Sequence, residues 1–98
     1  MSVYVDSLRH IRPSRRWPSK THCHMWADSQ LELFDMAEKL GLSDRWFQAH
    51  RRLPHFDLVA SKRERALEMG ALSQGNAEIV AKMKDIRFQQ EWDLRDGQ

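Results

Sequence analysis

The stretch His55-Phe56-Asp57-Leu58-Val59-Ala60-Ser61-Lys62-Arg63-Glu64 decides the fold, because a short apolar run in it passes directly into a helix signal. Residues 56–60 have the apolar character of a strand. Ser61 and Glu64 have the spacing of a capping box, in which the serine hydroxyl accepts a hydrogen bond from the backbone N–H three residues on. We therefore expect a strand over 56–60 and a helix over 61–70.

Two cations follow the expected cap. Lys62 and Arg63 fall in the first helical turn, where the helix dipole disfavours positive charge. An anion bound at the helix N-terminus offsets this cost, because backbone N–H groups, a hydroxyl and two cationic side chains then converge on it. We expect Ser61, Lys62 and Arg63 to bind a phosphate group; the alternative is that both cations extend into water.

Candidate catalytic residues lie upstream of this cap. His55 and Asp57 are separated by one residue, which places an imidazole and a carboxylate on the same face of the expected strand. Asp6 directly follows another β-type run, Val3-Tyr4-Val5, and α/β proteins place their chemistry at such strand ends. Asp6, His55 and Asp57 therefore become candidates for catalysis.

A further strand is expected over residues 21–28, where apolar and polar side chains alternate imperfectly. In an extended chain, one face carries His22, His24 and Trp26, and the other carries Cys23, Met25 and Ala27. Two histidines at this spacing can bind a metal ion, although most such pairs bind none. His24 joins the candidate catalytic residues.

The next helix is the clearest in the sequence. Ser29 and Glu32 form a second capping box, which predicts a helix over 30–40 that stops at Gly41. The chain thus contains two strand–helix units in series, an arrangement that favours an α/β layer with adjacent parallel strands. We expect one α/β domain over residues 1–98, with a small, three-stranded, mostly parallel sheet and an added C-terminal helix.

That C-terminal helix is expected over residues 76–92. Phe88 and Trp92 fall roughly on the side opposite its main apolar stripe. Because a single helix buries one side in a small domain, this pair predicts contact with a second copy of the chain in a homodimer. The alternative is that the helix bends or ends before Phe88, so that both aromatics cover the edge of the core.

The composition is typical of a globular protein. Of 98 residues, 41% are hydrophobic and 31% are charged, which excludes the disordered and membrane classes. No apolar run approaches the length of a membrane span and the N-terminus lacks a secretory pattern, so we expect a cytoplasmic protein with no membrane partner. Cys23 is the only cysteine, which excludes an intramolecular disulfide and a four-thiolate zinc site.

Basic charge gathers at the front of the chain, where residues 1–27 hold five cations and one acidic residue. Residues 7–20 contain two prolines and have the character of a long exposed loop. Its Arg15-Arg16-Trp17 triplet can hold phosphate and stack on a base, as in proteins that bind single strands. Trp17 and Trp26 are therefore candidate base-stacking residues; the alternative for the loop is a solvated segment without a ligand.

An ordered series of short motifs runs through residues 3–72: Val3-Tyr4-Val5-Asp6, His24-Met25-x-Ala27-Asp28, Leu40-Gly41-Leu42, Trp46-Phe47-Gln48, Pro54-His55-x-Asp57-Leu58, Ser61-Lys62-Arg63 and Gly70-Ala71. In these motifs the chain resembles the domain-of-unknown-function family 4031, small proteins of bacteria and their phages. The resemblance leaves 73–98 as a C-terminal extension and brings no activity with it. It implies that one set of polar residues belongs together: Asp6, His24, Asp28, His55, Asp57, Ser61, Lys62 and Arg63.

Three functions are compatible with these residues. The first is a bacterial or phage module that binds a phosphorylated ligand, either a nucleotide or nucleic acid, through Ser61, Lys62 and Arg63. The second is a phosphodiester hydrolase or nuclease that uses Asp6, His24, His55 and Asp57, either through a histidine base or through a divalent metal held by Asp6, Asp28 and Asp57. The third is a phage protein in the host cytoplasm that docks on a host protein through the Phe88 and Trp92 face.

Overall fold

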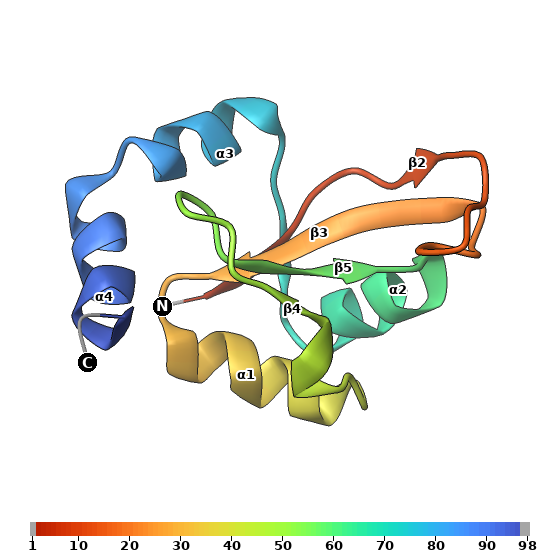
Figure 1. Ribbon diagram of the computed structural model, residues 1–98, viewed down its shortest axis with the longest axis horizontal. Helices are drawn as coiled ribbons and strands as arrows, with labels where there is room; N and C mark the ends of the chain where they lie inside the picture. The colour runs from red at the N-terminus through yellow and green to blue at the C-terminus, as the bar shows by residue number, and fades with distance from the viewer. Residues whose placement is uncertain (1, 97–98) are drawn as a thin grey trace.

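Three antiparallel strands form the centre of the sheet in the computed structural model, which describes residues 2–96, with side chains up to residue 92 (Figure 1). They are β1 (Val3–Val5), β3 (Thr21–Ala27) and β5 (His55–Leu58). β3 lies between the other two, with Val5 opposite Met25 on one side and Phe56 opposite Met25 on the other. The apolar side chains of this row are fully buried, which makes it the middle of the core.

Short strands extend this centre at both edges. β4 (Phe47–Gln48) pairs antiparallel with β5, and β6 (Leu72–Ser73) pairs parallel with β1, so that the order is β4-β5-β3-β1-β6. β2 (Arg9–His10) pairs with the start of β3, so the expected loop over 7–20 is in part a hairpin arm. The chain is α/β as expected, but the prediction of a three-stranded, mostly parallel sheet is wrong.

The reason for the error lies in the two edge strands. Each strand–helix unit is followed by a strand parallel to its own first strand: β4 is parallel to β3, and β6 is parallel to β5. Those return strands are only two residues long, too short for alternation to reveal them. The strands that the sequence did reveal, β3 and β5, are antiparallel neighbours.

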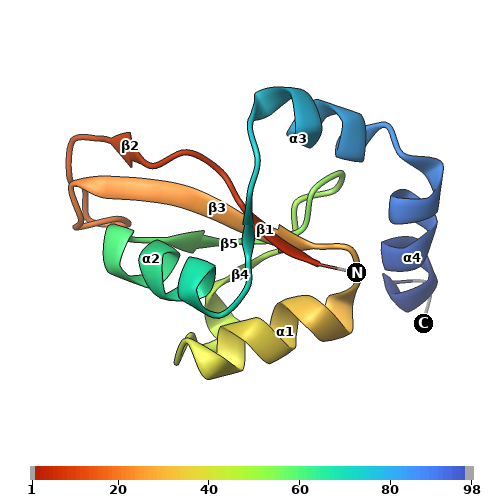
Figure 2. The same ribbon diagram turned by 180° about the vertical axis from the view of Figure 1, so that it is seen from behind.

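Two helices cover one face of the sheet. α1 (Gln30–Lys39) and α2 (Ala60–Glu68) lie together below the strands in both views, while α3 (Asn76–Met83) lies on the other side (Figures 1 and 2). The buried side chains that these two helices contribute to the core include Leu33, Ala37 and Ala66. Apolar surface buried in this contact stabilises the fold by about 25 cal/mol per Å².

The two helix starts differ. The Ser29 hydroxyl accepts from the Glu32 N–H at 3.2 Å, as the capping box predicted, and Gly41 ends α1 with a φ of 76°. The capping box predicted at Ser61 and Glu64 is wrong, because α2 begins at Ala60, one residue earlier than expected, and Ser61 lies inside the helix. The Ala60 N–H donates instead to the Thr21 hydroxyl at 3.1 Å, so a side chain from β3 satisfies this helix end.

The C-terminal segment is two helices, α3 and α4 (Ile86–Asp96), and not the single helix expected over 76–92. Asp85 separates them, because its carboxylate accepts from the backbone N–H groups of Arg87 and Phe88 and so caps α4. Phe88 and Trp92 are buried within the chain, where the Trp92 ring stacks on Phe47 at 6.0 Å. The exposed face on which the expected homodimer rested is therefore absent from the described side chains.

No helix among residues 2–96 has the length and apolar character needed to cross a membrane.

Candidate functional site

A polar row crosses the three central strands on the face opposite α1 and α2. His24 lies directly opposite Asp57 of β5, and on its other side the Asp6 N–H donates to the His24 carbonyl at 3.2 Å. Asp6, His24 and Asp57 thus occupy one line across β1, β3 and β5. The alternation of each strand turns their side chains away from the apolar row of Val5, Met25 and Phe56.

Asp6 orients His24. One carboxylate oxygen accepts from the His24 backbone N–H at 2.6 Å, and the other lies 2.8 Å from the ring Nδ1. Arg9 Nη2 is 2.9 Å from the same Nδ1 and 3.7 Å from the carboxylate. Because a guanidinium only donates and the carboxylate is the stronger acceptor, we assign the proton to Nδ1, so that Nε2 carries the lone pair, with Arg9 Nη2 3.4 Å away.

Three imidazoles surround one oxygen of Asp57. The Nε2 atoms of His22, His55 and His24 lie 2.8, 3.5 and 4.0 Å from Asp57 Oδ1. The ring proton of neutral His55 is also assigned to Nδ1, because this atom lies 2.8 Å from the Leu53 carbonyl and must donate to it. The four side chains, which we name the histidine cluster, are 13–25% exposed.

The charges in the histidine cluster are strongly coupled. Burial alone would raise the pKa of Asp57, but hydrogen bonds from His55 and His22 outweigh it and lower this pKa to about 2. Burial alone would lower the pKa of His55, yet hydrogen bonds to Asp57 and the Leu53 carbonyl raise it. The pKa of Asp6 is lowered in spite of burial because the ring and the backbone N–H of His24 donate to it.

The arrangement has a direct chemical consequence. With Nδ1 protonated, a neutral His24 or His55 turns its Nε2 lone pair toward the anionic Oδ1 of Asp57, and this contact is repulsive. A proton or a cation between the nitrogen and oxygen atoms removes the repulsion. The facing atoms of His22, His24 and Asp57 all lie within 4.8 Å of one another, so one metal ion can reach all three.

A family model described as "Protein of unknown function (DUF4031)" matches residues 3–86. The chain belongs to this family. No curated protein and no solved structure matches the chain. The match with DUF4031 continues beyond residue 72 through α3, and it includes the whole histidine cluster together with Asp6 and Arg9.

In this DUF4031 chain, the fold brings together all four candidate catalytic residues, Asp6, His24, His55 and Asp57. His22 completes the group; the spacing of residues 21–28 marked it only as half of a His22/His24 pair that can bind a metal ion, and it was not among the candidate catalytic residues. Its signal was the alternation of residues 21–28, which placed it on the same face as His24. What the sequence did not supply was the register that puts β5 beside β3.

Asp28, predicted as a metal ligand, lies elsewhere. β1 and β3 are antiparallel, so the end of β3 lies beside the start of β1, at the opposite end of the sheet from Asp6. There the Asp28 carboxylate accepts from the Ser2 N–H, the Tyr4 hydroxyl and Lys82 Nζ at 2.9–3.0 Å. Asp28 therefore links β1 to α3 and does not contribute to the histidine cluster.

The residues predicted to bind phosphate do not converge on an open helix N-terminus. Lys62 Nζ donates to the Leu40 carbonyl at 2.6 Å and so completes the C-terminus of α1. Arg63 Nε donates to the Asp6 carbonyl at 2.8 Å, while Ser61 is exposed on α2. Both cations thus have partners inside the protein, and Arg63 supports the backbone of Asp6.

The two candidate stacking residues have different surroundings. Trp26 is fully buried against Tyr4 and cannot stack on a ligand. Trp17 is half-buried, donates from Nε1 to the Thr21 carbonyl at 2.7 Å, and meets the His22 ring edge-on. It lines a groove of about 800 Å³ that also reaches His22 and Asp57.

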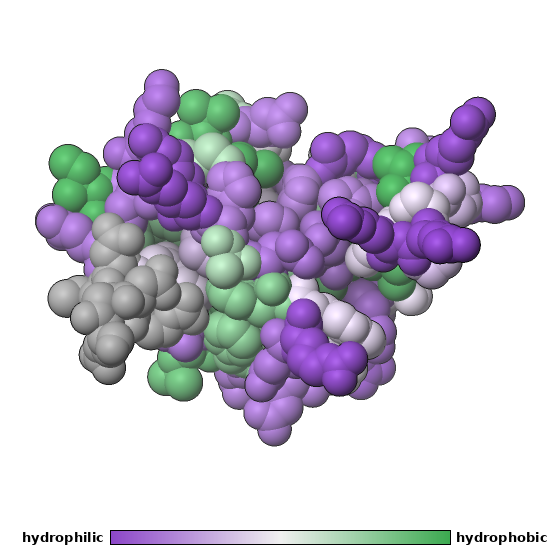
Figure 3. Space-filling view, in the orientation of Figure 1, coloured by the Kyte–Doolittle hydropathy of each residue, from purple (hydrophilic) through white to green (hydrophobic). Residues whose placement is uncertain are grey.

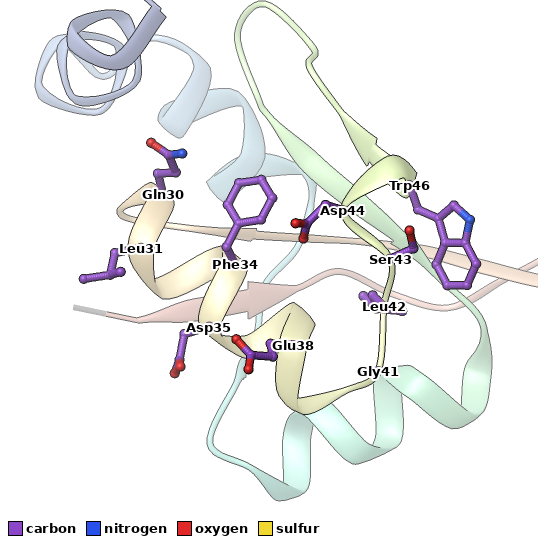
Figure 4. A pocket seen from close by; sticks show the side chains of 10 residues that line it. All are labelled: Gln30, Leu31, Phe34, Asp35, Glu38, Gly41, Leu42, Ser43, Asp44 and Trp46. Carbon is purple, nitrogen blue, oxygen red and sulfur yellow. The ribbon is translucent and has the colours of Figure 1, made fainter.

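A second hollow lies between α1 and η1 (Asp44–Trp46), away from the histidine cluster (Figure 4). It is lined by apolar side chains, among them Leu31 and Phe34, and by three carboxylates, Asp35, Glu38 and Asp44. Figure 4 shows these side chains on α1 and on the segment that follows it, and none comes from the strands that carry the histidine cluster.

Proposed function

We propose that this protein is a metal-dependent phosphodiester hydrolase whose metal ion binds to His22, His24 and Asp57. The observation that carries the proposal is the convergence of three Nε2 atoms on Asp57 Oδ1, with two of the rings held at Nδ1 by other acceptors. Histidines that ligate metals usually donate their other ring nitrogen to a carboxylate or a backbone carbonyl. His24 does so to Asp6 and His55 to Leu53.

The ligand set favours zinc or a related first-row transition metal. Imidazole and carboxylate together suit zinc, iron, nickel and copper, whereas magnesium and calcium prefer oxygen ligands. Ligand atoms at about 2.0–2.2 Å from a tetrahedral zinc ion lie about 3.4 Å apart. The facing atoms, up to 4.8 Å apart, must therefore draw together when an ion binds.

Three protein ligands leave one coordination position for water, as in catalytic zinc sites. A zinc ion held by His22, His24 and Asp57 would act as a Lewis acid and would activate a water molecule as the nucleophile toward the phosphodiester. His55 lies beside Asp57 with its Nε2 facing the site, so it is placed to take the proton from water and to return it to the leaving oxygen. Arg9, beside Asp6, supplies positive charge for the phosphate.

This proposal replaces the helix-start phosphate site as the first candidate. Lys62 and Arg63 would have to give up hydrogen bonds to carbonyls of Leu40 and Asp6 in order to bind an anion. The histidine cluster requires no such rearrangement of its backbone. Docking on a host protein has no observation in its favour among the described side chains, because Phe88 and Trp92 pack inside the chain.

The test combines metal binding with turnover. Calorimetric titration of the metal-free protein with Zn²⁺ is expected to give one site per chain, which His22→Ala and Asp57→Asn abolish. Hydrolysis of bis(p-nitrophenyl) phosphate with Zn²⁺, Mn²⁺ or Co²⁺ is expected to fall to background in the same variants. His10→Ala is the matched control, because His10 is exposed on β2 and outside the cluster.

The proposal fails in either of two cases: if zinc binds equally well to His22→Ala and the wild type, or if no phosphodiester is cleaved with any of the three metals. Circular dichroism of each variant separates loss of the site from loss of the fold.

A further inference from the structure

The groove beside the histidine cluster is lined with groups that suit a nucleic acid strand. It lies between the arm that precedes β3 and the segment around η1, and it includes His22, Asp57, Trp17, Trp46, Arg16 and Arg45. Two candidate metal ligands therefore form part of its wall. A molecule bound along the groove reaches the proposed metal site without any rearrangement of the strands.

The cations of the groove are available to a ligand. Within the described part of the chain, the side chains of Arg16 and Arg45 form no hydrogen bond or ion pair, unlike Lys62 in the same wall. Asp57 is the only carboxylate among the lining residues. At the end of the molecule formed by β2 and the loop to β3, hydrophilic side chains predominate, with a few apolar ones among them (Figure 3). Unpaired guanidinium groups in a concave wall attract phosphate.

The groove contains two tryptophan side chains, which differ in their contacts and in their exposure. Trp17 is held by the Thr21 carbonyl and by His22, whereas Trp46 is 56% exposed. An exposed indole beside free arginines is the combination with which proteins bind single-stranded nucleic acids, because bases stack on the ring while cations follow the backbone. A duplex keeps its bases stacked on each other and cannot use Trp46 in this way.

We infer that the groove binds single-stranded nucleic acid, with a base stacked on Trp46 and the backbone held by Arg16 and Arg45. The inference rests on the proposed function, because it names the substrate that the metal centre would cleave. It assigns the stacking role to Trp46, which carried no such role in the sequence, and it places the scissile phosphate at the end of the groove formed by His22 and Asp57.

The experiment measures binding apart from catalysis. Fluorescence anisotropy of a labelled 12-nucleotide thymidine strand is recorded in EDTA at low salt, so that no metal is present and no cleavage occurs. Trp46→Ala and Arg45→Gln are each expected to weaken binding about tenfold. Arg45→Gln should also reduce the slope of log affinity against log salt concentration by about 0.7. The matched controls are Leu31→Ala, an exposed apolar residue in the other hollow, and Arg65→Gln, an exposed arginine on α2.

The outcomes separate the two proposals. Loss of strand binding in the groove variants, with zinc binding intact, supports the groove as the binding site. If the protein binds the strand but binds no zinc, the groove is still supported, although the hydrolase proposal then fails. Equal binding by wild type and Trp46→Ala, tighter binding of a duplex of the same length, or no binding at low salt overturns the groove even if zinc binds. A matching RNA strand shows which sugar the groove prefers.

Discussion

At the residue scale, Asp57 is the centre around which the site is built. Its Oδ1 is the one atom that all three imidazoles face, and its pKa of about 2 keeps it anionic throughout the physiological range. Asp6 acts through His24, because it fixes which nitrogen of that ring faces Asp57. A carboxylate that orients a histidine in this way tunes a metal site without touching the ion.

Asp6→Asn tests this positioning role. The asparagine carbonyl can still accept from the His24 backbone, but its amide group then donates to Nδ1 and forces the ring proton onto Nε2. Zinc affinity is expected to fall about 10–100-fold, measured by calorimetric titration. Nitrogen-15 NMR of the imidazoles should report the change of His24 tautomer, which a purely structural role would leave unchanged.

The control for this variant is Asp35→Asn, which removes an exposed carboxylate that pairs with Lys39. It should bind zinc as the wild type does. An unchanged zinc affinity in Asp6→Asn would contradict the assigned role.

At the scale of single elements, the starts of the two sheet-covering helices differ in a way that can be measured. Ser29 caps α1 with its hydroxyl, whereas α2 relies on Thr21 of β3. Ser29→Ala is expected to lower the free energy of unfolding by about 1 kcal/mol, and Ser61→Ala by less than about 0.5 kcal/mol, because Ser61 lies exposed inside α2. Urea unfolding followed by circular dichroism gives both values. A larger loss for Ser61→Ala would favour the capping box that the sequence suggested.

The same elements mark the limit of prediction from the sequence. Local signals predicted β1, β3 and α1 to within one residue, because caps, glycine stops and alternation act over a few residues. The strand expected over 56–60 lies at 55–58, so its end was placed two residues too late. The direction of β5 relative to β3 depends on two-residue strands that carry no pattern. The polar row could thus be predicted as a set of residues, but its geometry could not. His22 was not chosen as a catalytic candidate because Asp57, the partner that places it in the cluster, is 35 residues away in the sequence.

At the scale of the whole molecule, Asp28 joins parts of the chain that are far apart. It links the start of β1, through Ser2 and Tyr4, to Lys82 of α3. Burial alone would raise the pKa of Asp28, but hydrogen bonds from Lys82 and Tyr4 outweigh it and lower this pKa below its ordinary value. A carboxylate whose pKa is lower in the folded state stabilises the fold above its unfolded pKa and loses that contribution as the pH falls.

Asp28→Asn should reveal this contribution as a function of pH. Above about pH 4 the variant is expected to be less stable than the wild type by about 1–3 kcal/mol, because a charged group with several hydrogen bonds is lost. As the pH falls toward 2, Asp28 of the wild type becomes protonated and the difference should shrink. Urea unfolding at a series of pH values measures both curves, and a difference independent of pH would contradict the role of the charge.

The edges of the sheet have a consequence for how the protein can meet other chains. β4 and β6, at the two ends of the path through the sheet, each offer only two residues of backbone. A free edge of that length presents too few N–H and C=O groups to template another strand, so it resists the addition of foreign peptides and the growth of fibrils. Pairing of a foreign strand with β4 or β6 is therefore disfavoured.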